Sequence, residues 1–229
     1  MTKKADTDLL NKMMERLNSM NESMTNMQAE MNQINIKLTS VLKENEELKQ
    51  EAVKREKIIK EMDKRMNLLE QRTRVNNIEI CNFPQTPNED LTEVVKAVGK
   101  TLKVNIKTED IQVVHRVQRF NKETTKNIIV NFISRWKKME IVNAAKSFTK
   151  SNKRNINSRD INQHVKESDI YIGDHLTPYN KKLLNKTKIL AKEKGWRFVW
   201  VRDCTIHVRQ NEGTRTYTMK DEEDLYIIQ

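Results

Sequence analysis

Apolar residues recur at alternating steps of three and four through the first third of the chain, from Leu10 to Leu69. An apolar residue about every 3.5 positions, kept in phase with no Gly or Pro, is the a/d seam of a left-handed coiled coil. Only Asn45 and Arg55 interrupt this seam with polar side chains. The seam residues expected to hold copies of the chain together are Leu17, Met24, Met31, Ile34, Leu38, Val41, Asn45, Leu48, Ile59, Met62, Met66 and Leu69.

The alternative is one amphipathic helix that packs on a globular core. A helix of about 60 residues would be roughly 90 Å long, which is too long for one small domain to cover. The pattern therefore predicts self-association through residues 1–73. Asn45 falls at an a position, which in parallel coils favours two strands, but a Met-rich seam specifies the number of strands poorly. A homodimer and a homotrimer both stay open.

Cysteine spacing and hydropathy restrict the class of protein. Cys81 and Cys204 lie far apart without a C-x-x-C spacing, which argues against a zinc module or a disulfide framework and fits a reducing compartment. No apolar run approaches the ~20 residues that span a bilayer, and the N-terminus lacks the apolar core of a signal peptide. We expect an intracellular protein, in the cytoplasm, the nucleus or both, without a membrane partner.

The positive charge is concentrated after the coil. Residues 1–73 contain 14 Lys and Arg against 13 Asp and Glu, out of 43 and 32 in the whole chain, so residues 74–229 carry 29 against 19, a net charge of +10. Basic folded domains bind polyanions, because phosphate binding releases counterions. Basic surfaces also serve solubility, which is the alternative.

Residues 74–167 are expected to form a domain of strands and helices. Period-two alternation predicts a strand at residues 75–83, and β-rich runs predict strands at 111–120 and 127–133. Helical spacing predicts one helix from residue 91 and a second after the N-cap Ser134, and a last strand is expected between 161 and 172. The expected apolar side of the second helix consists of Trp136, Met139, Ile141, Val142 and Ala145.

This order of elements is that of the ferredoxin-like fold that RNA-recognition domains use. Aromatic side chains on the open sheet face stack on bases there, but Glu79 and Ile128 stand at the expected aromatic positions, so the sequence argues against stacking. Phosphate contacts are expected from the second hairpin and from a flexible polar loop after the second helix, although such a loop is often only solvated. The residues concerned are Arg116, Arg119 and Lys126 on the hairpin, and Lys150, Lys153, Arg154 and Arg159 in the loop.

The sequence pattern of residues 168–229 predicts a small α-β-β-(β)-α domain. Thr177 is the expected N-cap of a helix that begins at Pro178 and stops at Gly195. "WRFVWV" and "IHVRQ" predict a hairpin around the turn "RDCT", "TRTYTM" predicts a third strand, and Asp221 with Asp224 predicts the cap of a short final helix. The whole chain is therefore expected to be an α+β protein with a long N-terminal coiled-coil helix, an RRM-like βαββαβ domain and this C-terminal domain.

Basic and aromatic residues interleave in the predicted hairpin. Such a surface on a small sheet binds single strands through charge and stacking. The alternative places Phe198, Trp200 and Val201 in the core, which leaves the arginines as the stronger candidates. The interleaved residues are Arg197, Arg202 and Arg209 with Trp196, Trp200 and His207.

Two families resemble parts of this sequence. "IGDHLTPYNKKLLNKTKILAKEKGWRFVWVRDCTIHVRQNEG" (Ile172 to Gly213) is similar to the C-terminal domain of the baculovirus few-polyhedra protein family. The order of coil, "RVNNIEICNFPQTPNEDL", "VVHRVQ", "KNIIVNF" and C-terminal domain resembles the first-open-reading-frame protein of LINE-type retrotransposons. Those proteins are coiled-coil oligomers that bind single-stranded nucleic acid, so the resemblance implies nucleic-acid contacts for Arg202 and Arg209. Cys204 stands where the few-polyhedra family has glycine, which predicts a less tight turn.

The expected function is that of a non-enzymatic, oligomeric protein that binds single-stranded nucleic acid, RNA in preference to DNA, in a packaging or chaperone role. The alternative is a coiled-coil scaffold, or a viral structural or trafficking factor, that binds proteins. The sequence has no G-x-x-x-x-G-K-[ST], H-E-x-x-H or G-x-S-x-G motif, and its histidines are scattered. Therefore no enzyme activity, metal, cofactor or small-molecule substrate is expected.

Overall fold

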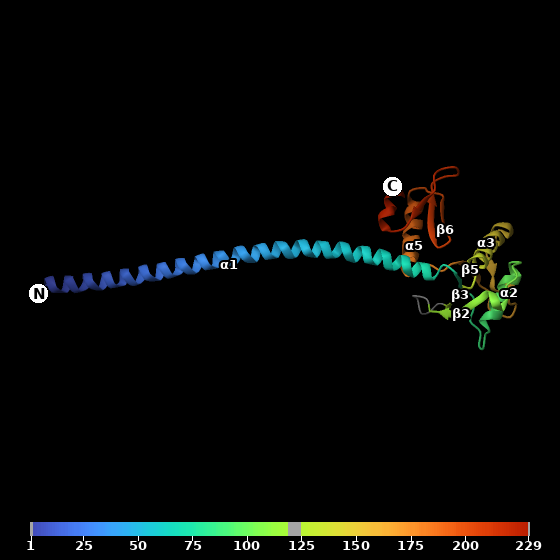
Figure 1. Ribbon diagram of the computed structural model, residues 1–229, viewed down its shortest axis with the longest axis horizontal. Coiled ribbons are helices and arrows are strands. Elements are labelled where there is room, and N and C mark those ends of the chain that lie inside the picture. The colour runs from blue at the N-terminus through green and yellow to red at the C-terminus, as the bar shows by residue number, and fades with distance from the viewer. Residues whose placement is uncertain (1, 119–124, 229) are drawn as a thin grey trace. The chain divides into compact units, whose positions relative to one another are not determined.

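A computed structural model of the chain describes residues 2–118 and 125–228, and the side chains from residue 10 onward. The chain divides into two units, residues 1–62 and residues 63–229. Helix α1 (Thr2–Thr73) runs without interruption, as Figure 1 shows. Every side chain from Leu10 to Met66 is exposed, including the apolar seam; Leu17 and Met66, for example, are 62% and 65% exposed.

The second unit is an α+β structure with two antiparallel sheets. The larger sheet has the strand order β2-β3-β1-β5-β4, and its pairs are all antiparallel. Its strands are β1 (Asn77–Cys81), β2 (Ile111–Val117), β3 (Asn127–Phe132), β4 (Ile156–Asn157) and β5 (Asp169–Asp174). The accompanying helices are α2 (Leu91–Thr101), η1 (Thr108–Asp110), α3 (Arg135–Asn152) and α4 (Ser158–Ile161).

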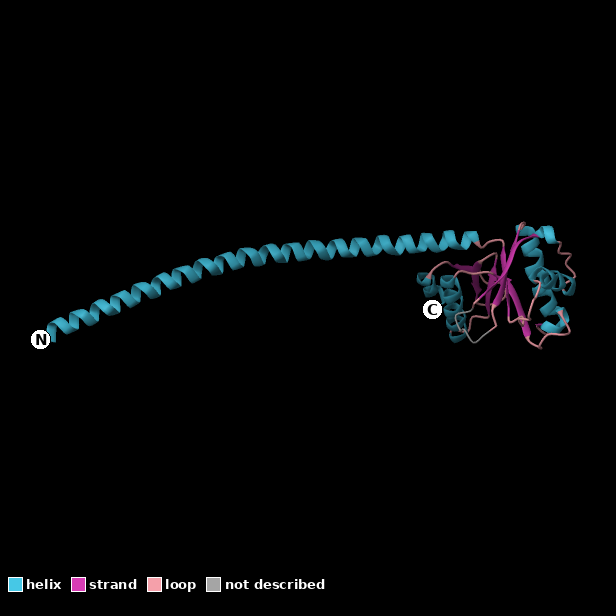
Figure 2. Ribbon diagram, turned by 90° about the horizontal axis from the view of Figure 1, so that it is seen from below, coloured by secondary structure: helices cyan, strands magenta, loops and turns pink. Residues whose placement is uncertain are grey.

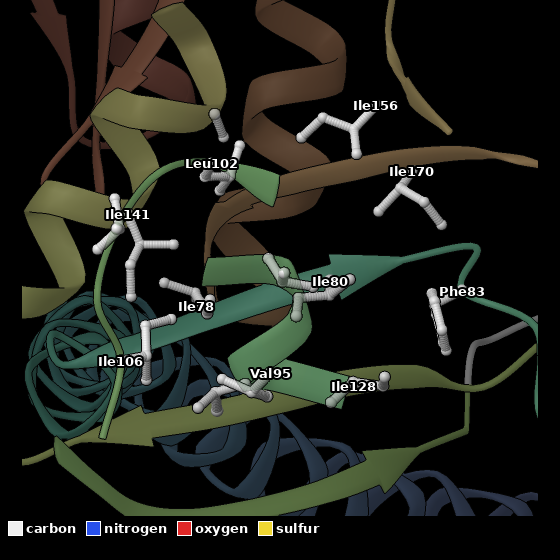
Figure 3. Packing of buried hydrophobic residues seen from close by; sticks show 14 of the residues in the cluster. Ile78, Ile80, Phe83, Val95, Leu102, Ile106, Ile128, Ile141, Ile156 and Ile170 are labelled. Atoms are coloured by element: carbon white, nitrogen blue, oxygen red, sulfur yellow. The ribbon is translucent and has the colours of Figure 1, made fainter. Parts of the chain in front are cut away.

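The core of this part lies between one sheet face and the helices. Ile78 and Ile80 of β1 are fully buried, and they pack with Ile128 of β3, Val95 of α2 and Ile141 of α3. Figure 3 shows these side chains converging between the strands and the helices, and Figure 2 shows helices on both sides of the magenta strands, which belong to the two sheets. Period two in the strands and period 3.6 in the helices direct these apolar residues to the same layer.

Several expectations for this region are confirmed, and others are wrong. The strands and helices lie near the expected positions, and Asp90 caps α2 with hydrogen bonds to the Thr92 and Glu93 N–H groups. Ser134 is the N-cap of α3, but its side chain makes no capping hydrogen bond. Trp136 does not lie on the apolar side of α3: it is 78% exposed, because its position is about 140° around the helix from Ile141.

The expected polar loop after α3 is also wrong in part. Lys150 still belongs to α3, Lys153 is its C-cap in a left-handed conformation with φ 53°, and β4 and α4 follow. The last strand, β5, pairs with β1 and ends at Asp174. The larger sheet therefore continues past the domain boundary expected between residues 167 and 168.

The C-terminal elements form the second sheet, with the order β6-β7-β8. They are α5 (Pro178–Glu193), β6 (Phe198–Arg202), β7 (Thr205–Arg209), β8 (Tyr217–Met219) and the 3₁₀ helix η2 (Glu222–Ile228). The expected caps are present: the Thr177 hydroxyl oxygen accepts from the Asn180 N–H at 3.1 Å, and Gly195 has φ +71°. Asp221 accepts from the Glu223 and Asp224 N–H groups, which caps η2 as expected.

The last turns of α1 contact the elements around α5. Gln71, which is 9% exposed, donates from Nε2 to His175 O and accepts the Thr177 N–H on Oε1. Asn67 accepts from the Thr177 hydroxyl at 2.6 Å, and Lys64 forms ion pairs with Asp221 and Glu223. These residues occupy the b and f positions of the heptad, which are away from the a/d seam. The seam residues Met62, Met66 and Leu69 are 64%, 65% and 63% exposed.

Candidate nucleic-acid interface

One face of the C-terminal sheet carries aromatic and basic side chains in cross-strand pairs. Phe198 pairs with Arg209 and Trp200 with His207, while Arg202 pairs with Thr205 beside the turn. Val199, Val201, Ile206 and Val208 alternate with them and belong to the core on the other face. Val201 and Trp196 therefore pack in the core, whereas Phe198 and Trp200 lie on the opposite face. We call Phe198, Trp200, Arg202, His207 and Arg209 the aromatic–basic face.

Stacking orders this face. The Arg209 guanidinium carbon lies 4.7 Å from the centroid of the Phe198 ring. The Trp200 and His207 rings are stacked, with centroids 5.5 Å apart and an interplanar angle of 24°. Burial, and secondarily the positive charge of Arg202, lower the pKa of His207 below its usual value. His207 is therefore neutral at pH 7 and offers a flat, uncharged ring.

Arg209 has an unsatisfied donor. Its Nε is buried and lacks a hydrogen-bond partner among residues 2–118 and 125–228. A buried N–H without a partner is rare in folded proteins, because it loses its hydrogen bond to water. Because this Nε is inaccessible to solvent, an oxygen of a bound phosphate or base would reach it only after the Arg209 side chain moves.

A small cleft adjoins this face. It has a volume of about 90 Å³ and lies between α3 and the β6–β7 turn, and Arg202 is part of its lining. Lys146, an exposed residue of α3, lines the same cleft and donates from Nζ to Val201 O at 2.9 Å. Arg202 therefore belongs both to the aromatic–basic face and to the cleft, where Lys146 supplies a second positive charge. Sequence reasoning missed Lys146, because nothing in the pattern of α3 indicates that it contacts β6.

Buried ion pairs hold the turn against α3. Lys138 forms an ion pair with Asp174 at the end of β5, and their side chains are 1% and 2% exposed. Asp203, at the tip of the hairpin, lies 3.8 Å from Lys138 Nζ and is also paired with Arg135. Lys138 and Asp174 lie in an interior with a low dielectric constant, which strengthens the attraction between their opposite charges. The network connects the larger sheet to the C-terminal hairpin.

The β6–β7 turn is tighter than Cys204 led us to expect. Only Asp203 and Cys204 separate the two strands, and both have positive φ, 54° and 62°. Such a pair of left-handed residues makes a type I′ hairpin, whose twist matches that of the strands. Cys204 is buried, and this burial raises the pKa of its thiol to about 11, so the side chain stays protonated.

The open face of the larger sheet presents no aromatic platform at the expected positions. Glu79 is 8% exposed, and its carboxylate accepts from Asn127 Nδ2 at 2.6 Å and from Lys181 Nζ at 2.8 Å. Ile129, not Ile128, lies across from Glu79 on this face, while Ile128 points into the core. Glu79 and Ile129 are both buried, at 8% and 1% exposed, so neither position offers a surface on which a base could stack.

The remaining candidate residues fall into four groups. Arg116 is engaged within the fold: its side chain is 7% exposed, pairs with Glu89 and donates to the carbonyl oxygens of Phe83, Pro84 and Lys126. Arg154 pairs with Asp160, and Arg159 with Glu167. Arg119 lies outside the described residues. The exposed cations are Lys126, Lys150, Lys153 and Arg197.

Residues 177–229 match a family model described as Baculovirus FP protein domain 2. This FP domain 2 segment begins at the N-cap of α5 and contains Arg197, Arg202 and Arg209. The match supports the expected likeness to the baculovirus FP family over this segment. The likeness to the retrotransposon protein stays a prediction. No curated protein matches the chain.

Within the described ranges, no three His, Cys, Asp or Glu side chains come together in a way that could hold a metal ion. None of the helices in the same ranges is both long and apolar enough to cross a membrane.

Proposed function

We propose that this chain is a non-enzymatic oligomer that binds single-stranded nucleic acid, RNA in preference to DNA, with little sequence specificity. The aromatic–basic face carries this proposal, because it combines stacked rings with arginines and an unsatisfied Arg209 donor. Phe198 and Trp200 would stack on bases, while Arg202, Arg209 and Lys146 would contact phosphates. Stacking and phosphate contacts together favour unpaired strands, whose bases are accessible. The preference for RNA rests on the resemblance to the retrotransposon protein.

We also assign the larger sheet and its helices to an RRM-like domain. The order β2-β3-β1-β5, with α2 and α3 on one face, supports the assignment. Because Glu79 stands where an aromatic platform would be needed, this domain would not bind bases itself. It would instead support the C-terminal hairpin through Lys138 and Asp174. Base contacts would then come from the C-terminal domain.

Self-association would use the seam of α1. The b and f residues Asn67, Gln71 and Lys64 bind the C-terminal domain, so the a/d residues are free for another copy. Several weak binding faces joined in one oligomer raise the effective concentration for a long strand. The coil would thereby supply avidity, in either the homodimer or the homotrimer.

The test is the affinity of the purified chain for a labelled single-stranded RNA and its DNA equivalent, measured by fluorescence anisotropy from about 50 to 200 mM salt. Trp200→Ala should weaken binding by about 1–3 kcal/mol. Arg202→Gln should reduce by about one the slope of the logarithm of the affinity against the logarithm of the salt concentration. Lys188→Gln is the matched control, because Lys188 is an exposed cation of α5, which packs on the opposite face of the C-terminal sheet.

Two results would contradict the proposal. One is the absence of binding at low salt. The other is equal loss of affinity in Arg202→Gln and Lys188→Gln, which would show that net charge, not the aromatic–basic face, is responsible. In either case the scaffold alternative, with protein partners, would replace it.

A further inference from the structure

One edge of the larger sheet is only partly covered. β4 pairs with β5 at Ile170 and Asp169 and then ends, so no described strand pairs with Ile172 on that side. The hydrogen bond from the His175 N–H to Asn77 O indicates which residues of β5 face β1, namely Tyr171 and Gly173. By the alternation of an antiparallel ladder, Ile172 directs its N–H and C=O outward. Such an unpaired edge is a template for another strand.

A groove runs along this edge. It has a volume of about 380 Å³ and extends beside Ile170, Tyr171 and Ile172, with Asn155 and Ile156 at β4. Its other wall is α3, through Ala145, Lys146, Thr149 and Lys150. Four of these lining residues are apolar and belong to or pack on the core: Ala145, Ile156, Ile170 and Ile172. The groove can therefore receive side chains from a strand that pairs with Ile172.

The charges of the groove have one sign. Lys146 and Lys150 are exposed on its rim, and no acidic residue is part of its lining. The two lysines are four residues apart on a helix, about 6 Å along the axis. Side chains on the same face of a strand lie a similar distance apart, ~6.6 Å. Acidic side chains at alternate positions of an added strand would thus match both lysines.

We propose that the β5 edge binds an extended protein segment by strand addition, with acidic and apolar side chains at alternate positions facing α3. The occupant is a peptide and not a nucleic acid strand, because a ribose–phosphate chain lacks the regular N–H and C=O groups that continue a ladder. The isoleucine floor also accepts apolar side chains, whereas phosphates would lose hydration there. This surface is independent of the aromatic–basic face, although Lys146 borders both.

The probe is the capped heptapeptide Thr-Glu-Thr-Glu-Thr-Val-Thr, labelled with a fluorophore and titrated with the full chain. Its central Glu would pair with Ile172 through its backbone N–H and C=O, and the Glu and Val side chains would face α3. Saturable binding is expected for this peptide. Binding should be lost when the Glu and Val nitrogens are methylated, because methylation removes the ladder donors. It should also be lost when Lys replaces both Glu residues.

Variants of the chain locate the binding. Lys150→Glu should weaken binding roughly tenfold by placing like charges together. Thr149→Trp should block the groove from an exposed position of α3. Lys153→Glu is the matched control, because Lys153 is an exposed cation outside the groove, and it should leave the affinity within about twofold.

Three results would overturn this inference. The peptide could fail to bind at millimolar concentration, or its methylated form could bind equally well. Alternatively, single-stranded RNA could lose affinity in Thr149→Trp while the peptide does not bind, which would assign the groove to nucleic acid. RNA binding to the aromatic–basic face is measured with the Trp200→Ala variant, so the outcome for one surface does not decide the other.

Discussion

Gly99 shows how a single hydrogen atom in place of a side chain determines local packing. A Cβ at this position of α2 would lie 2.7 Å from Val104 O and 2.7 Å from the Ile106 side chain. Val104 in turn donates its N–H to Gly99 O at 2.8 Å, which holds the two segments together. The backbone oxygen cannot retreat without breaking this turn after α2.

Gly99→Ala should therefore destabilise the globular half by about 1–3 kcal/mol through overpacking. This loss should exceed the gain of about 1 kcal/mol in helix propensity. Urea unfolding followed by tryptophan fluorescence measures the change. Gly173→Ala is the control, because no heavy atom lies within 4 Å of its added Cβ. Equal stability of the two variants would show that α2 can shift freely.

His175 makes stability depend on pH. Burial, and then the positive charge of Arg74, lower its pKa to about 4, while Glu79 opposes and Lys181 and His115 add to the lowering. The unfolded chain has a histidine pKa near 6.5. Between about pH 6.5 and pH 4 the unfolded state therefore binds a proton that the native state does not. The stability contributed by neutral His175 is present above this window and is lost as pH falls through it.

His175→Gln should remove this pH dependence. Unfolding free energies at several pH values between about 7 and 4 should fall more steeply for the natural chain than for the variant. Carboxylates titrate in both proteins, so the difference between the two curves reports His175. Parallel curves would mean that His175 is protonated without loss in the folded state.

At the scale of elements, two faces of helix α1 have different roles. The b and f positions bind the C-terminal domain, and the a/d positions are exposed apolar side chains. Propensity alone stabilises an isolated helix in water only marginally, and most helix stability comes from packing of an apolar face. We infer that the seam of α1 is completed by another copy of the chain.

A lysine in the seam should dissociate the oligomer. Leu38→Lys replaces an a-position side chain whose burial contributes about 1.5–3 kcal/mol per helix. Light scattering should therefore show a shift toward the monomer mass. Ile36→Lys is the matched control: Ile36 is 71% exposed and lies at an f position, so the mass should not change. A monomer in the natural chain would refute the coiled-coil reading.

At the scale of the whole molecule, buried charges connect the two sheets. Asp203 contacts Arg135 and Lys138, so the hairpin tip is tied to α3 and, through Asp174, to β5. This arrangement places Arg202 beside Lys146 in one cleft. Lys138 and Asp174 form the buried pair, whereas the side chains of Asp203 and Arg135 are 28% and 52% exposed, so solvent screens their attraction.

Asp203→Asn should loosen this connection and keep the turn. Asn adopts the left-handed conformation with little strain, so the type I′ geometry is retained. Because Arg135 is half-exposed and Lys138 keeps its pair with Asp174, we expect a loss of about 1 kcal/mol in stability. We also expect separate unfolding of the C-terminal domain, measured by urea unfolding with tryptophan fluorescence. Asp224→Asn, which loosens the η2 cap away from the cleft, is the comparison. A single unchanged transition would indicate that the ion pairs do not couple the sheets.

Most elements follow from local sequence signals. Heptad spacing, capping residues and the change from period 3.5 to period two predicted α1, α5 and the strands of both sheets other than β4. The family likeness of residues 177–229 was likewise readable from the segment that contains Arg202 and Arg209. The expected polar loop and the apolar side of α3 at Trp136 were wrong, since they depend on what packs against the helix.

Long-range packing determines which side chains meet. Lys138 and Arg116 have the residue types of surface cations, yet each is buried against a carboxylate from another element. Lys146 reaches the hairpin, and the outward edge of β5 stays uncovered because β4 is short. These relations join residues far apart in the chain, and local periodicity carries no information about them. The aromatic–basic face arises in the same way, because cross-strand register places Trp200 on His207 and Arg209 on Phe198.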